Sequence, residues 1–128
     1  MIQKINVNDL FSRFSDLWSP KIAGKINDTQ VKFLKLKGEF IWHHHDHEDE
    51  LFFVIKGNLE IQLRDQPHLY LSPGEMVIIP KGVDHKSIAK EEVHVIVFEQ
   101  VGIKYTGNVE DRNIQIKDEE ISPSTISS

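Results

Sequence analysis

Histidine is concentrated in one short segment of the sequence, where residue type and spacing could support metal chemistry. Four of the seven histidines lie within residues 42–50, Trp-His-His-His-Asp-His-Glu-Asp-Glu. Along a β-strand, side chains two residues apart point to the same face, so His43 and His45 can converge on one ion while His44 points the other way. Glu50 opens the next apolar run after a four-residue connection, and an antiparallel arrangement would bring its carboxylate beside the two imidazoles. Such ligands suit zinc, nickel, iron or manganese.

The residues alone leave other interpretations of the histidines open. The segment could be a solvated polar loop between strands or a loose metal-scavenging tract. His47 shares the parity of His43 and His45, so it competes as a ligand if the strand continues unbroken. His85 begins another strand after a predicted tight turn at residues 79–82, but a lone histidine in such a place is more often structural than a ligand. Because the sequence has no cysteine, any metal must be held by nitrogen and oxygen.

Two segments together resemble the paired motifs of the cupin superfamily. The first motif is present as Gly38 followed by His43-x-His45-(x)4-Glu50-(x)6-Gly57, and the second as Gly74-(x)5-Pro80-x-Gly82-(x)2-His85. The resemblance covers residues 38–89, and the sixteen residues between the motifs match the short spacing of single-domain microbial cupins. There are two departures. Four residues rather than five separate Gly38 from His43, and Ala89 stands where the second motif often has Asn.

The resemblance implies an all-β fold, a cupin jelly-roll β-barrel with an opening at one end for a small molecule. It also implies that His43, His45, Glu50 and His85 hold one divalent metal ion per chain inside the barrel. Such a ligand set leaves one or two coordination positions open, whereas a structural zinc is normally closed at four ligands. The chain most resembles small single-domain cupins grouped with mannose-6-phosphate isomerase, although it is far shorter than that enzyme. The family commonly forms homodimers, so a homodimer is expected.

The pattern around the motifs predicts the strands that position these residues. From residue 21 onward the apolar period changes to two, with turn residues between short runs. The predicted strands are residues 21–26, 29–37, 51–56, 59–64, 68–71, 76–79 and 93–98. Gly57 and Asn58 predict a two-residue hairpin. Residues 76–79 and 93–98 are apolar on both faces and are expected to be central strands. Lys32, Lys35 and Lys37 are expected on a solvated strand face.

Three parts of the chain are distinguished. Residues 1–20 predict a short amphipathic helix, N-capped by Asn8 and stopped by Pro20, that packs on the barrel or on a dimer partner. Residues 21–107 form the predicted cupin barrel. Residues 108–128 predict a C-terminal arm and a disordered tail.

Composition restricts the class of partner. The formal net charge of −5 argues against nucleic-acid binding, which depends on clustered Lys and Arg. The first residues lack the features of a signal peptide, and no stretch approaches the roughly 20 apolar residues of a membrane span. A cytoplasmic protein is expected.

Two functions are compatible with these features. The first is a metal-dependent enzyme, isomerase- or dioxygenase-like, that acts on a small oxygen-rich metabolite such as a carbohydrate derivative or a hydroxy or keto acid. The second is a non-catalytic module that binds a sugar or another metabolite. No general acid or base is identified, although Glu99, Glu48, Asp49 and Tyr70 are candidates by polarity. His44 and His68 are expected to be exposed, and the orientation of His94 is left open.

Overall fold

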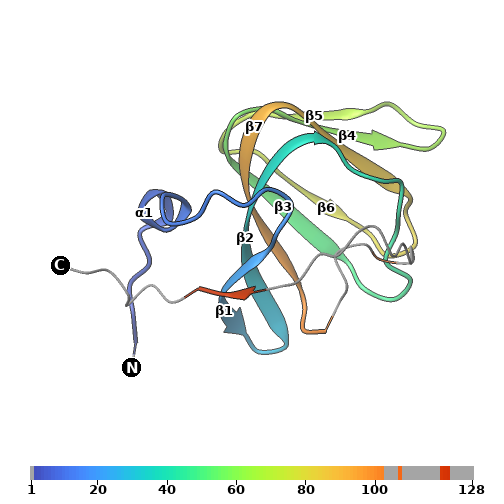
Figure 1. The fold of residues 1–128 in the computed structure, drawn as a ribbon. Coiled ribbons are helices and arrows are strands. Elements are labelled where there is room, and N and C mark those ends of the chain that lie inside the picture. The colour runs from blue at the N-terminus through green and yellow to red at the C-terminus, as the bar shows by residue number, and fades with distance from the viewer. Residues whose placement is uncertain (1, 103–106, 108–118, 122–128) are drawn as a thin grey trace.

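The structure is a computed structural model that describes residues 2–102, 107 and 119–121. Within these residues it contains one short helix and eight strands (Figure 1). The helix is α1 (Val7–Phe11), and the strands are β1 (Lys21–Ile26), β2 (Thr29–Glu39), β3 (Glu50–Lys56), β4 (Leu59–Leu63), β5 (Leu69–Leu71), β6 (Met76–Ile79), β7 (His85–Gln100) and β8 (Glu119–Glu120). The predicted all-β jelly roll with a short N-terminal helix is confirmed.

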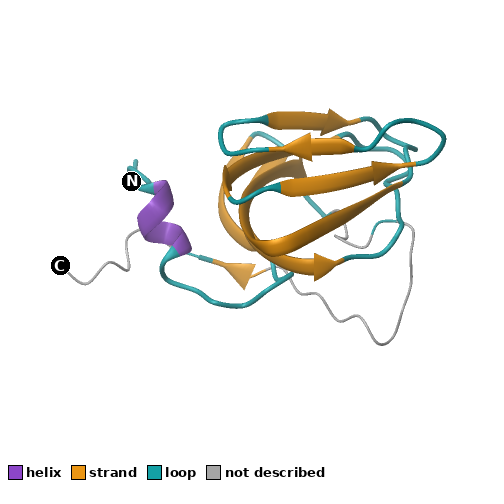
Figure 2. Cartoon of the chain, turned by 90° about the horizontal axis from the view of Figure 1, so that it is seen from above, coloured by secondary structure: helices purple, strands orange, loops and turns teal. Residues whose placement is uncertain are grey.

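The long strand β7 joins the two halves of the barrel. The strands are ordered β5-β4-β7-β2-β1-β8, and β3 pairs with both β6 and β7. The first residues of β7 pair with β4, in a register that sets His85 opposite Leu63, and its later residues pair with β2 and β3. The sheet therefore curls around one interior, with α1 lying outside the wall (Figure 2).

Strand alternation separates an inner from an outer apolar cluster. The inner cluster fills the barrel with side chains such as Leu34, Phe52, Ile61 and Val95. The outer cluster lies beneath α1 and consists of Leu10, Phe11, Phe33 and Ile96, with further partly buried side chains around it. Helix α1 therefore packs on its own barrel, and the rings of Phe11 and Phe33 lie 4.7 Å apart.

The turn at Gly57 has the expected conformation but not the expected pairing. Gly57 has φ +82°, and an added Cβ would lie 2.6 Å from the carbonyl oxygen of Glu92, so glycine is required there. The prediction of a hairpin at Gly57 and Asn58 was nevertheless wrong, because β3 pairs with β6 and β7 while β4 pairs with β5 and β7. At this point the chain passes from β3, which pairs with the later residues of β7, to β4, which pairs with its first residues.

The N-terminal helix is shorter and begins earlier than expected. Its N-cap is Asn6, whose side chain accepts a hydrogen bond from Asp9 N at 2.9 Å, so the prediction of Asn8 was wrong. The helix ends at Phe11, and the segment that follows it donates hydrogen bonds to β2. Trp18 N donates to Lys35 O at 2.8 Å, and Trp18 Nε1 donates to Lys37 O at 2.9 Å.

Two expectations about exposure were wrong. Strand β6 pairs with β3 alone among the described strands, and Met76 and Ile78 are 60% and 57% exposed, so this apolar run is an edge strand. Strand β7 is central, as predicted. Lys32 and Lys35 are buried rather than solvated, and Lys37 is exposed.

Most of the predicted C-terminal arm and tail lies outside the described residues. Glu119 and Glu120 form β8, which pairs in parallel with β1. Lys21 Nζ lies 2.7 Å from Glu119 Oε2, across this pairing. No helix in the described part of the chain is long and apolar enough to cross a membrane.

Candidate metal centre

The two histidine-containing motifs meet at a small antiparallel bridge. His43 N donates to His85 O at 3.0 Å, and His85 N donates to His43 O at 2.9 Å. His43 lies in the connection between β2 and β3, and His85 is the first residue of β7. A third backbone bond, from Gly82 N to His45 O at 2.7 Å, ties the turn before β7 to the same connection. The backbone thus fixes the position of three predicted ligands.

The four predicted ligands converge in the interior. Ligand atoms of His43, His45 and Glu50 all lie within 4.8 Å of one another, and the three side chains are buried. His45 Nε2 lies 3.2 Å from Glu50 Oε2. His85 adjoins this group, because its Nε2 lies 3.5 Å from Glu50 Oε1 and its ring centroid lies 4.4 Å from that of His43.

Hydrogen bonds at Nδ1 fix the orientation of two of the imidazole rings, those of His43 and His85. The Nδ1 atoms of His43 and His85 each lie 3.0 Å from a backbone carbonyl oxygen, that of Ile41 and that of Val83 respectively. A carbonyl oxygen only accepts, so each Nδ1 carries the proton. In the neutral ring this leaves Nε2 as the atom with a lone pair, which is the arrangement of histidines that ligate metals.

Several buried polar atoms of this cluster have unsatisfied hydrogen-bonding capacity. Among the described residues, no hydrogen-bond partner is found for Nε2 of His45, Nε2 of His85 or either carboxylate oxygen of Glu50. Buried polar atoms are normally satisfied, because leaving them without a partner is costly. Nitrogen and oxygen donors that converge in this way suit a divalent transition metal. The residues present therefore fit a metal ion.

The electrostatics of the cluster favour the forms that bind metals. Burial, together with the neighbouring His85, lowers the pKa of His43 to about 4, so its imidazole is neutral at physiological pH. Burial alone would raise the pKa of Glu50, but the nearby imidazoles of His45 and His85 outweigh burial and hold the pKa well below its usual value. Neutral imidazole and ionised carboxylate are the ligating species.

A buried ion pair that the sequence did not predict lies next to this cluster. Lys32 Nζ lies 2.7 Å from Glu99 Oε1, and the two side chains are 1% and 0% exposed. Burial, and then the carboxylate of Glu50, raise the pKa of Glu99 well above its usual value. Strand parity offered a signal for Lys32, because Leu34 and Leu36 share its face and point inward.

The other candidates lie away from the cluster. His44 is half-buried and points outward, with Nδ1 2.6 Å from Asp84 Oδ1 and Nε2 2.8 Å from Asp46 Oδ1. His47 is exposed, which does not support it as a ligand. His68 is exposed, as expected, and His94 points outward and stacks on Phe11 with ring centroids 4.8 Å apart.

The candidates for a general acid or base differ in their exposure and in their distance from the cluster. Asp49 is exposed, and its Oδ1 accepts a hydrogen bond from Lys81 N at 2.9 Å, which caps the turn before β7. Tyr70 is 73% exposed on β5. Glu48 lines a hollow beside the cluster. Of the four candidates, Glu99 alone lies buried against a predicted ligand.

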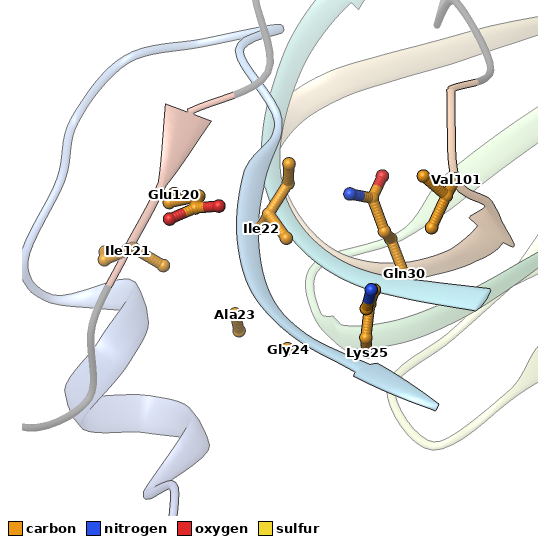
Figure 3. A pocket seen from close by; sticks show the side chains of 8 residues that line it. All are labelled: Ile22, Ala23, Gly24, Lys25, Gln30, Val101, Glu120 and Ile121. Carbon is orange, nitrogen blue, oxygen red and sulfur yellow. The ribbon is translucent and has the colours of Figure 1, made fainter. Parts of the chain in front are cut away.

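The described residues line two hollows of interest at the surface. One of about 240 Å³ opens beside the cluster and is lined by His45, His47, Glu48 and Gly107, among others. The other, of about 420 Å³, lies between β1 and β8, where Ile22, Lys25, Glu120 and Ile121 contribute to its lining (Figure 3). None of the predicted ligands lines the second hollow. The first hollow, by contrast, is lined by one predicted ligand, His45.

Comparison with known proteins identifies the class of this barrel. Residues 32–99, more than half of the chain, match the family model described as the cupin domain. The chain belongs to the cupin family, as its paired motifs predicted.

Individual relatives agree with this assignment. A cupin-2 domain containing protein from Shewanella frigidimarina NCIMB 400 has 49% sequence identity and a TM-score of 0.73, over 75% of this chain and 93% of that one. The Bacillus subtilis (strain 168) "Uncharacterized protein YdbB" is 38% identical over 63 residues, which are 49% of this chain and 56% of that protein. Hydroquinone 1,2-dioxygenase from Sphingomonas sp. TTNP3, solved with 4-hydroxybenzoate bound, has a TM-score of 0.70 over 77% of this chain and 32% of that one. Its sequence identity is 15%, so it shows the fold alone.

Proposed function

We propose that the protein binds one divalent metal ion per chain through His43, His45, Glu50 and His85. The observation that carries this proposal is the convergence of buried imidazole nitrogens and carboxylate oxygens in one place. The hydrogen bonds from Nδ1 of His43 and His85 support it, because they present Nε2 toward the interior. Zinc, nickel, iron and manganese are all compatible with these donors.

We further propose an enzyme that acts on a small oxygen-rich metabolite, with isomerase- or dioxygenase-like chemistry. The substrate class is a carbohydrate derivative or a hydroxy or keto acid that chelates the ion through adjacent oxygens. When bound, the ion would supply Lewis acidity toward a carbonyl or hydroxyl oxygen, or an oxygen-binding centre if it is iron. The chain itself would orient the substrate in the hollow beside His45, where Asp46 and His47 provide polar contacts.

A non-catalytic binding module is the second candidate, and one observation favours it. Among the described residues, the buried charged side chains other than the proposed ligands are Lys21, Lys32, Lys35 and Glu99. Each already has an ion pair or a hydrogen bond within the fold. The three lysines are engaged in these contacts, and Glu99 keeps one carboxylate oxygen, Oε2, without a partner in the described part of the chain. Few buried groups could therefore act on a substrate, as expected of a module that only captures a metabolite.

A turnover screen separates the two functions. The protein would be loaded with each of the four metals and incubated with a panel of sugars, sugar phosphates, hydroxy acids and keto acids. The enzyme proposal expects metal-dependent conversion that is lost in His45→Ala and retained in the matched variant His44→Ala, whose side chain points outward. Binding of a panel compound without conversion would favour the module. Conversion that persists in metal-free protein would contradict the metal-dependent proposal.

A homodimer is also proposed, through the outer face of β3 and β6. Phe53 and Ile55 on β3 are half-buried there, and Met76 and Ile78 on β6 are exposed. Phe53 and Met76 are partners in the strand register, so these side chains form one apolar surface. Apolar surfaces of this kind are typical of interfaces. Strand β6 pairs with β3 alone among the described strands, so it offers an edge to a partner.

A further inference from the structure

Three charged side chains lie on the inner wall of the barrel, on neighbouring strands. Lys32 is on β2, Glu99 on β7 and Glu50 on β3, and β7 pairs with both of the other strands. Each shares the parity of inward-facing residues on its own strand, listed here as Leu34 on β2, Val97 on β7 and Phe52 on β3. The row leads from a lysine, through a carboxyl group, to a proposed metal ligand.

The contacts along this row are short and buried. Lys32 Nζ binds Glu99 Oε1 at 2.7 Å. The second oxygen of Glu99, Oε2, is buried and has no hydrogen-bond partner within the described part of the chain. Glu99 also lies beside Glu50, because the antiparallel register that sets Leu51 of β3 opposite Phe98 of β7 places the next two positions, Glu50 and Glu99, across from each other.

Stability does not explain why such a pair is buried here. Removing two charges from water is unfavourable, and apolar residues of similar volume are often as stable or more stable in the same position. Two carboxyl groups placed side by side add repulsion, which a nearby cation relieves. Lys32 supplies that cation on one side, and a metal ion held by Glu50 would supply it on the other. The arrangement therefore matches a role in holding groups in place.

We infer that Lys32 and Glu99 are positioning residues of the metal centre, in which Lys32 anchors Glu99 and Glu99 fixes the orientation of the Glu50 carboxylate toward His45 and His85. This inference rests on the proposed metal site. Partners behind the ligands of a metal typically change its affinity by about 10–100-fold. The pair should therefore affect the geometry and the affinity of the site without itself touching the ion.

Cobalt(II) is a suitable probe, because its visible spectrum reports the coordination geometry independently of activity. Wild type, Lys32→Met and Glu99→Gln would be titrated with cobalt(II) in competition with a chelator. Lys35→Met is the matched control, since Lys35 is buried on the same strand but faces outward and binds Phe14 O. We expect about a 10–100-fold loss of affinity and an altered spectrum in the first two variants, and a wild-type spectrum and affinity in the control, even where its melting temperature falls.

Several outcomes would overturn the inference. Folded Lys32→Met and Glu99→Gln proteins with wild-type affinity and spectrum would show that the pair is only structural. If either single variant does not fold, the double variant Lys32→Met/Glu99→Leu removes both charges together, and it must still show weakened binding and a changed spectrum. A wild-type protein that binds no cobalt(II) would instead refute the proposed metal site, and the inference with it.

Discussion

His43 and His85 exchange a pair of backbone hydrogen bonds, 3.0 Å from His43 N to His85 O and 2.9 Å from His85 N to His43 O. The two residues belong to different motifs, and the bridge between them is isolated from the named strands. Because the bond pair is formed at the proposed ligands themselves, the spacing between the two imidazoles is set by backbone geometry. The candidate site is therefore preorganised by the fold rather than assembled from mobile loops.

Alanine substitution should distinguish the metal ligands from nearby histidines that do not bind the ion. His43→Ala, His45→Ala, Glu50→Ala and His85→Ala should each abolish or severely weaken metal binding, because each leaves the coordination sphere incomplete. His44→Ala and His47→Ala should keep close to wild-type stoichiometry, because one side chain points outward to Asp84 and the other is exposed. Metal content after dialysis measures the difference.

Glu50 offers the sharpest form of this test. Glu50→Gln preserves the shape of the side chain but removes the negative charge, so affinity should fall. If Glu50→Gln binds as tightly as wild type while His47→Ala loses the ion, the carboxylate assignment is wrong and the ligand set is entirely imidazole.

Metal removal should destabilise the fold. An ion that binds only the folded state stabilises it by about 2.7 kcal/mol when its free concentration is about a hundredfold above Kd. The proposed ligands come from separate segments, so the unfolded chain does not reproduce the site. Thermal melting before and after chelation measures the effect, with re-addition of the metal as the control. An unchanged melting temperature after complete removal would argue against a site built across strands.

The metal-free protein should lose stability in mildly acidic solution because of His43. Its pKa is lowered by burial from 6.5 to about 4 in the folded protein. Below pH 6.5 the imidazole of His43 therefore becomes protonated in the unfolded chain but stays neutral in the folded protein until the pH approaches 4. The contribution of His43 to the free energy of unfolding is complete above pH 6.5 and is lost as the pH falls toward 4. Between pH 7.5 and 5, chelated wild type should lose about 2 kcal/mol more free energy of unfolding than His43→Gln. Equal losses in urea titrations of the two proteins would count against this account.

Assembly should depend on the outer face of β6. Ile78→Glu places a charge in the proposed interface and should convert the dimer to a monomer. Ile26→Glu is a matched control, because Ile26 is 58% exposed and Ile78 is 57% exposed, and Ile26 lies on β1 instead. Sedimentation or light scattering gives the mass. A monomeric wild type at high dilution, or a dimer that survives Ile78→Glu, would refute the proposed interface.

Much of the barrel could be predicted because strand periodicity and turn residues are local signals. The bounds predicted for residues 21–26 and 76–79 coincide with β1 and β6, and His85 begins β7 as expected. The fold class and the grouping of His43, His45 and Glu50 came from motif spacing, which reflects how the β2–β3 connection and the first residue of β3 place their side chains.

The remaining features depend on partners distant in the sequence. Four consecutive apolar residues in β6 do not reveal how many strands pair with them, so its edge position was not predicted. The charge of Lys32 predicted an exposed side chain, whereas its position in the strand alternation predicted a buried one. The side chain is buried because it pairs with Glu99, which lies 67 positions away in the sequence. The segment around Trp18, which was expected to be helical, likewise hydrogen-bonds to β2, a strand distant in the sequence.

Elemental analysis of the purified protein tests the central claim most directly. The protein should be analysed as isolated, and again after chelation and reloading with zinc, nickel, iron or manganese, with the His85→Ala protein treated in parallel. We expect close to one divalent ion per chain in the wild type and substantially less in His85→Ala. A wild-type protein that carries no metal and binds none of the four ions after reloading would contradict the metal centre.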